Sequence, residues 1–212
     1  MTTRDPEGER RTILILSTVL FVVSGGISVA GLMLIDMPRD FLRPPVAGSL
    51  IAGLLVTIPM LAGLQIVRLS HWKWLHDLWR TPCELIGPAI GGATFTQLLL
   101  IAVMAGVGEE LLFRGFLQHW LVEHAAWAGL IVPNIVFGLL HWVSRVYAAA
   151  TFLVGLYLSC LLHFVPGVDL WSLMLAHGLY DLVALLVLKR QVDGTVHSDS
   201  AVRRGSPTPP AD

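Results

Sequence analysis

The chain has 212 residues, of which 55% are hydrophobic and only 14% are charged, and its mean hydropathy is +0.71. Soluble domains carry roughly 25% charged residues, so this composition excludes an ordinary soluble fold. The net charge of −1 offers no basic surface, and we predict no nucleic-acid partner. The apolar residues form long blocks, which is typical of an all-α, polytopic transmembrane helix bundle.

These blocks predict about six membrane spans. The first, at 12–35, is longer than the apolar core of a signal peptide (about 7–15 residues), so we expect a span that is not cleaved. The other predicted spans are 46–67, 85–107, 128–142, 147–164 and 171–188. Together they predict a single transmembrane domain over 1–190, with a polar, disordered tail at 191–212.

Two segments between the spans have a different character. Residues 68–84 mix tryptophans with cations, a composition that predicts a helix at the membrane interface. Residues 109–124 are amphipathic and carry a pair of glutamates, which predicts an amphipathic or re-entrant helix. If this helix crossed the membrane completely, the count would become seven and the C-terminus would change sides.

The distribution of basic residues predicts the orientation. With six spans, most of the cations next to span ends fall on one side: Arg10, Arg11, Arg68, Lys73, Arg80, Arg145, Lys189 and Arg190. Because such residues favour the cytoplasmic side, we predict an integral protein of the bacterial plasma membrane with both termini in the cytoplasm. Arg39 and Arg43 in the first outer loop are accompanied by Asp36 and Asp40.

Three polar clusters lie in the C-terminal half, over 105–188, where charged groups in hydrocarbon are costly and often functional. In the first, Glu110 and Arg114 are four residues apart, so they share a helix face and can pair. Glu109 then lies about 100° round the helix without a local partner. An unpaired, poorly solvated carboxylate is suited to act as a general base.

The second and third clusters each bring a histidine. Asn134, Phe137 and His141 repeat at helical spacing and are expected to line one helix face. His177 and Asp181 are also four residues apart, and a carboxylate in that position can fix the imidazole tautomer and leave the other ring nitrogen free.

Each cluster also has a purely structural interpretation. The glutamates could be solvated at the interface, His141 could bind a backbone carbonyl, and His177 with Asp181 could be a polar pair that joins helices. The clusters together favour chemistry, because Glu109, His141 and His177 supply a base and two imidazoles from three helices. The sequence has neither the Gly-x-Ser-x-Gly motif of a serine hydrolase nor the His-Glu-x-x-His motif of a zinc peptidase.

The three clusters resemble the ordered motifs of a known family. Glu-Glu-x-x-x-Arg at 109–114, Phe-x-x-x-His at 137–141 and His-x-x-x-Asp at 177–181 are similar to those of the CPBP family, the CAAX-prenyl-protease and bacteriocin-processing (Abi) intramembrane proteases. The run Phe-Arg-Gly-Phe-Leu at 113–117 extends the likeness. The resemblance covers about 105–185 and not the first three spans.

The resemblance implies a helix bundle with a water-accessible cavity inside the bilayer. It implies that Glu109 and His141 activate the attacking water, while His177 and Asp181 stabilise the oxyanion or position the substrate. Glu110 and Arg114 would hold the site together. One departure is Asp181, since the eukaryotic branch of the family usually has Asn there, and an ionised aspartate cannot donate to an oxyanion.

We therefore predict an intramembrane endopeptidase of the CAAX-protease type that cleaves a membrane-associated peptide or protein. We expect no cofactor; the alternative is a catalytic zinc held by Glu109, His141 and His177, with a fourth position open. Two other functions remain open: a non-catalytic membrane immunity or scaffold protein, and a small proton-coupled transporter, which would usually show repeat symmetry. Nothing in the sequence specifies an oligomeric state.

Overall fold

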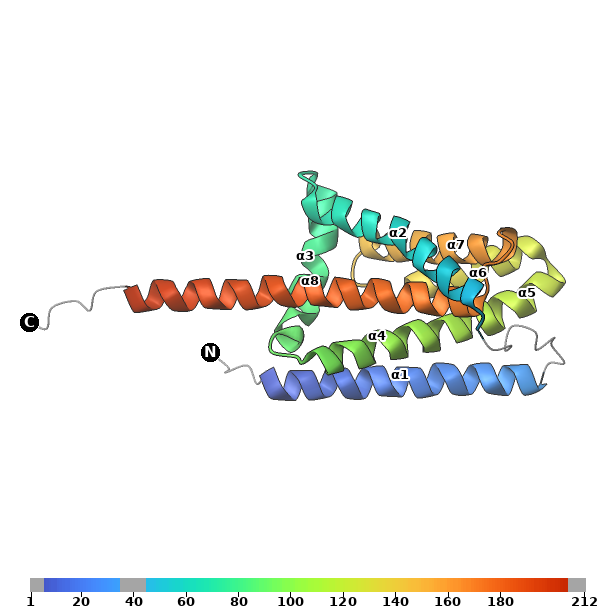
Figure 1. Ribbon diagram of the computed structural model, residues 1–212, viewed down its shortest axis with the longest axis horizontal. Helices are drawn as coiled ribbons and strands as arrows, with labels where there is room; N and C mark the ends of the chain where they lie inside the picture. The colour runs from blue at the N-terminus through green and yellow to red at the C-terminus, as the bar shows by residue number, and fades with distance from the viewer. Residues whose placement is uncertain (1–5, 35–44, 206–212) are drawn as a thin grey trace, which may run out of the picture.

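The protein is a bundle of helices. The structure, a computed structural model, describes residues 6–34 and 45–205, and every regular element within these ranges is helical. The elements in chain order (Figure 1) are α1 (Pro6–Leu34), α2 (Ala47–Leu69), α3 (Lys73–Ile90), α4 (Phe95–Glu110), the π-helix η2 (Leu111–Gln118), α5 (His119–His124), α6 (Ala126–Leu140), α7 (Arg145–Phe164) and α8 (Leu170–Gly205).

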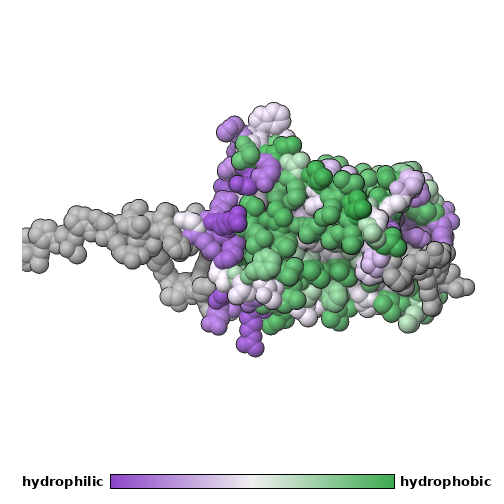
Figure 2. Space-filling model, viewed as in Figure 1, coloured by the Kyte–Doolittle hydropathy of each residue, from purple (hydrophilic) through white to green (hydrophobic). Residues whose placement is uncertain are grey.

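Five helical segments are long and apolar enough to cross a membrane. They are Arg10–Leu34, Ala47–Leu69, Phe95–His124, Arg145–Phe164 and Leu170–Gly194, and the shorter apolar helix α6 runs beside them as a sixth. α1 begins and α8 ends at the same end of the bundle (Figure 1), as an even number of crossings requires. Figure 2 shows that the middle of the visible face of the bundle is hydrophobic, with hydrophilic residues gathered at its two ends. The prediction of an all-α membrane bundle with about six spans is confirmed.

The helix that carries the two glutamates differs from the expectation. α4, η2 and α5 form one continuous run over Phe95–His124, so the glutamates lie in the middle of a spanning helix and not on a separate amphipathic or re-entrant one. This run begins later than expected, because Thr94 caps it: Thr94 Oγ1 accepts from the Gln97 N–H, and Gln97 Oε1 accepts from the Thr94 N–H. The helix does not end at the two glutamates, because neighbouring helices bury both side chains.

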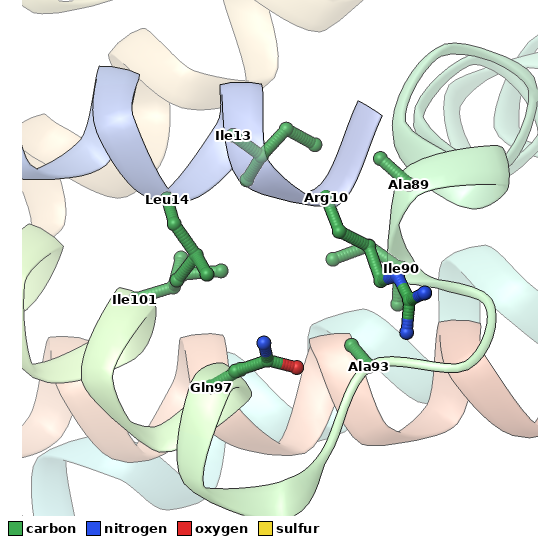
Figure 3. Close-up of a pocket in the computed structure, with 8 residues that line it drawn as sticks. All are labelled: Arg10, Ile13, Leu14, Ala89, Ile90, Ala93, Gln97 and Ile101. Carbon is green, nitrogen blue, oxygen red and sulfur yellow. The ribbon is translucent and has the colours of Figure 1, made fainter. Parts of the chain in front are cut away.

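Helix α3 takes the place of the predicted interfacial segment. It lies across one end of the bundle, roughly perpendicular to the spanning helices (Figure 1). Trp79 Nε1 donates to Gln191 Oε1 and so joins α3 to α8. At the turn after α3, Arg10 Nη1 donates to the Gly92 carbonyl at 2.9 Å, and Figure 3 shows the Arg10 side chain reaching from α1 towards Ala89, Ile90 and Ala93. These contacts fix α3 against the ends of α1 and α8.

Helix α8 is packed on α4 and α2 and places the third motif against the first. Its N-terminus is capped by Asp169, whose Oδ1 accepts from the Ser172 N–H at 2.8 Å, while the Ser49 hydroxyl of α2 donates to Oδ2. At its other end α8 remains helical to Gly205, beyond the boundary expected at residue 190. The predicted disordered tail stays a prediction for 206–212, and Asp36, Arg39, Asp40 and Arg43 lie outside the described residues.

Candidate active site

Glu110 and Arg114 form the predicted ion pair. Arg114 Nη1 donates to Glu110 Oε1 at 3.1 Å, and both side chains are completely buried. Burial at this depth removes the water that would otherwise solvate the charges, so each group depends on the other and on further hydrogen bonds. The pair is therefore part of the interior of the bundle and not a solvated pair at the interface.

Arg114 also binds two other helices. Its Nη2 donates to Asn134 Oδ1 on α6 at 3.2 Å and to the Gly155 carbonyl on α7 at 2.9 Å. A Cβ at Gly155 would lie 2.6 Å from Asn134 Oδ1 and 2.9 Å from Arg114 Nη2, so only glycine leaves room for the guanidinium. Asn134 completes this network by donating from Nδ2 to Ser159 Oγ at 2.8 Å. The motif arginine thus ties η2, α6 and α7 together.

His177 is held by Glu110 and not by Asp181. The Nδ1–H of His177 donates to Glu110 Oε1 at 2.8 Å, because a carboxylate oxygen can only accept in this bond. Asp181 Oδ2 lies instead 3.6 Å from Nε2, the opposite ring nitrogen. The expectation that Asp181 fixes the imidazole through one nitrogen and leaves the other free is therefore wrong: Glu110 has that role, from the neighbouring helix.

Glu109 faces the ring nitrogen that Glu110 leaves open. Its Oε2 lies 3.9 Å from His177 Nε2, and this buried oxygen has no hydrogen-bond partner within the described part of the chain. The residue is only 8% exposed. A buried carboxylate oxygen without a donor is ready to accept a proton or a hydrogen bond from a small molecule such as water. This is the property that the sequence predicted for Glu109.

Phe137 lies between the two motif histidines. Its ring centroid is 4.5 Å from that of His141 and 6.3 Å from that of His177, and the Arg114 guanidinium carbon lies 5.0 Å above the same ring. His141 Nδ1 donates to the Phe137 carbonyl at 2.8 Å, and His141 interacts electrostatically with Asp181. Asn134, Phe137 and His141 therefore share the helix face predicted for them, although the closeness of Glu109 to His141 stays a prediction.

Sequence analysis missed two polar residues near this cluster. Gln118 is buried and donates from Nε2 to the Ser159 carbonyl at 3.1 Å; its position four residues after Arg114, on the same helix face, was the signal that could have found it. Tyr147 interacts electrostatically with both Asp181 and Glu109, and no local pattern marks it.

The helix that carries Arg114 is also wider than expected. η2 is a π-helix of eight residues, and π-helical turns are rare and frequently found at functional sites. Five of its residues are buried: Phe113, Arg114, Gly115, Phe116 and Gln118. No periodicity in the sequence distinguishes this segment from an ordinary α-helix.

A metal ion would need several ligands placed close together. Zinc binds histidine nitrogen and carboxylate oxygen at about 2.0–2.2 Å from three protein ligands. In the ranges that the structure describes, no three His, Cys, Asp or Glu side chains are placed to hold a metal ion. His177 directs Nδ1 to Glu110 and Nε2 between Glu109 and Asp181. The alternative site of Glu109, His141 and His177 is not assembled among the described residues and stays a prediction, and no step is derived through a metal.

Comparison with known proteins gives one match. Residues 91–183 match the family model described as Type II CAAX prenyl endopeptidase Rce1-like. No curated protein and no solved structure matches the chain. The matched segment contains all three motifs and the helices that bring them together. The resemblance drawn from the motifs is confirmed: the motif-bearing segment of this chain is similar to the Rce1-like type II CAAX prenyl endopeptidases.

Proposed function

We propose that the chain is an intramembrane endopeptidase that cleaves a membrane-associated peptide or protein with water activated by Glu109 and His141. The observation that carries the proposal is the buried Glu109 carboxylate, whose unpartnered Oε2 lies 3.9 Å from His177 Nε2. The family match supports the reaction class, and the contacts of Glu110 and Arg114 support a site held rigid from several helices.

In the proposed reaction Glu109 removes a proton from water, and the hydroxide attacks the carbonyl carbon of the scissile peptide bond. The carbonyl π electrons move to oxygen, and Nε2 of His177, carrying a proton, donates a hydrogen bond to the oxyanion. When the intermediate collapses, the C–N bond breaks and the protonated Glu109 returns its proton to the leaving amine. His141 orients the water from the α6 side.

Glu110 has a supporting part in this scheme. Because it accepts from Nδ1 of His177, Nε2 remains the ring nitrogen that faces the reacting atoms. Asp181, 3.6 Å from the same Nε2, limits how the ring can turn. Each group thus acts from a fixed position, which lowers the reorganisation needed in the transition state.

The substitution Glu109→Gln tests the proposal directly. Glutamine keeps the shape of the side chain and can still hydrogen-bond, but it is not a base, so cleavage should be lost while the melting temperature is retained. Membrane proteomics of cells with the wild type or with Glu109→Gln should show one or more uncut proteins that accumulate only in the variant. Glu123→Gln, an exposed glutamate on α5, is the matched control. Identical proteomes for wild type and Glu109→Gln would overturn the proposal.

The metal-free form of the mechanism has its own test. Full activity of the purified protein after exhaustive chelation is the expected result. Activity that is lost on chelation and restored only by zinc would overturn this form and favour the alternative ligand set. A non-catalytic immunity or scaffold function predicts instead that Glu109→Gln leaves every phenotype of the wild type unchanged.

We also propose that both termini face the cytoplasm. The support comes from Arg10, Arg68, Lys73 and Arg80, which lie on the side that the positive-inside rule assigns to the cytoplasm. A reporter enzyme of a kind that is active only in the cytoplasm should be active when it is fused after Arg190. Activity of a reporter that works only outside the cytoplasm, fused at the same position, would show that the C-terminus lies on the other side of the membrane.

A further inference from the structure

A second feature of the site involves α1, which lies outside the segment that matches the family. A cavity of about 130 Å³ lies between α1 and α4. Its walls include Ser17, Leu20 and Ser24 from α1 and Met104, Ala105 and Glu109 from α4. Glu109 therefore both lines this cavity and lies 3.9 Å from His177 Nε2.

The size and polarity of the cavity indicate what fills it. A cavity needs roughly 10–15 Å³ to hold one water molecule, and a water needs two to four polar partners. The pocket of Figure 3, beside Arg10, has a volume of about 10 Å³, which is enough for one water molecule at most. The cavity at Glu109 has room for several, and the hydroxyls of Ser17 and Ser24 and the Glu109 carboxylate supply three polar groups.

The Glu109 carboxylate is also short of hydrogen-bond partners inside the protein. Its Oε2 is buried and has no hydrogen-bond partner in the described ranges, and an unsatisfied buried polar atom is costly. Beside Glu109, α1 and α4 lie close together, because a Cβ at Gly108 would lie 2.7 Å from Ser24 Oγ, and Ser24 also lines the cavity. Water in the cavity would therefore lie beside the Glu109 side chain.

We propose that the cavity between α1 and α4 holds the water that Glu109 activates and is the path by which that water is replaced after each turnover. This inference rests on the proposed function and gives α1 a part in it. The competing occupant is an apolar group of a lipid or of the substrate, lying against Leu20 and Met104.

Thiol labelling tests whether the cavity is hydrated, and it needs no substrate. In a background with Cys83→Ser and Cys160→Ser, cysteine is placed either at Ala105, in the cavity, or at Val103, which is 48% exposed on the outer face of the same helix. A charged, membrane-impermeant methanethiosulfonate reacts with the hydrated thiolate, so the cysteine at 105 should be labelled at least about tenfold faster than that at 103. Equal rates, or labelling at 105 by an apolar maleimide alone, would overturn the proposal.

Filling the cavity tests whether its water is used. The substrate for this test is the uncut protein that accumulates in the Glu109→Gln variant. Ala105→Leu should lower its cleavage rate several-fold. Val103→Leu adds similar volume outside the cavity and should not change the cleavage rate. Both variants should keep the wild-type melting temperature. Unchanged cleavage by Ala105→Leu would overturn the supply route and leave the proposed function intact. Absence of cleavage by the wild type would overturn the proposed function, whatever the labelling shows.

Discussion

Nδ1 of His177 lies 2.8 Å from Oε1 of Glu110, and this hydrogen bond joins the third motif to the first across α8 and α4. The same Glu110 oxygen accepts from Arg114 Nη1 at 3.1 Å. Glu110 therefore links the structural arginine to the histidine that faces Glu109. Both adjacent glutamates have a buried Oε2 without a hydrogen-bond partner in the described residues, but only Glu110 is bonded to Arg114 and His177. In the proposed function Glu110 therefore holds the site, and Glu109 is left for chemistry.

The first prediction concerns the stability that Arg114 provides. Arg114→Ala leaves Glu110 buried without its ion pair and removes hydrogen bonds to Asn134 and Gly155. Breaking a buried pair by deleting one partner costs roughly 3–5 kcal/mol, so folded yield and melting temperature should both fall sharply. Arg80→Ala is the control, since Arg80 is exposed and its pairs with Asp77 and Glu84 lie at the surface. Equal thermal melting of the two variants in detergent would show that the Arg114 pair has no structural role.

The second prediction concerns Asp181, which stands where the eukaryotic branch usually has Asn. Its Oδ2 lies 3.6 Å from His177 Nε2, so a side chain of this size orients the ring. Asn keeps the size and adds a donor, and Asp181→Asn should retain cleavage close to the wild-type rate. The cleavage rate of Asp181→Ala should be at least about tenfold lower, a factor that corresponds to about 1.4 kcal/mol of transition-state stabilisation. If Asp181→Asn were as inactive as Asp181→Ala, the negative charge itself would be required.

The third prediction concerns the contact between the helices of the first and third motifs. A Cβ at Gly106 would lie 2.7 Å from the Gly178 backbone nitrogen, and backbone atoms in a helix cannot move aside cheaply. Gly106→Ala should therefore destabilise the bundle by roughly 1–3 kcal/mol. At Gly63 in α2 there is nothing within 4 Å of an added Cβ, so Gly63→Ala should leave the melting temperature unchanged or raise it. Equal melting temperatures for the two variants would show that α4 and α8 can separate at no cost.

The fourth prediction concerns pH and the cap of α8. Burial opposes ionisation of Asp169, but hydrogen bonds from Ser49 and Ser172 outweigh it, and the pKa of Asp169 lies below its ordinary value. A carboxylate with a lowered pKa stabilises the folded state above the pKa of the unfolded chain, about 3.9, and this stabilisation is lost as the pH falls through the folded-state value. The melting temperature of Asp169→Asn should thus be lower than that of the wild type at neutral pH, and the difference should shrink as the pH falls below the pKa of the unfolded chain, about 3.9. A difference that does not change with pH would show that the charge of Asp169 is irrelevant.

Much of the architecture could be predicted from local patterns. The apolar blocks predicted the membrane helices, because hydrophobicity over a span-length window depends only on the residues in that window. The exception was the segment from 85 to 124, where α3 continues to Ile90 and one long helix over Phe95–His124 replaces the predicted span and the separate helix after it. Amphipathicity suggested an interface there, but the polar face of that helix is buried against α6, α7 and α8.

The sequence by itself predicted the candidate site residues and determined which pairs were possible within a helix. Residues four apart must share a helix face, so the pairing of Glu110 with Arg114 and the helix face shared by Asn134, Phe137 and His141 followed from spacing alone. Only the tertiary structure decided the contacts between helices: that Glu110 and not Asp181 holds Nδ1 of His177, that Gly155 makes room for Arg114, and that α1 closes a cavity on Glu109. The physical reason is that helical periodicity fixes the direction of each side chain on its own helix, whereas the rotation and depth of one helix against another depend on how all the buried surfaces fit together.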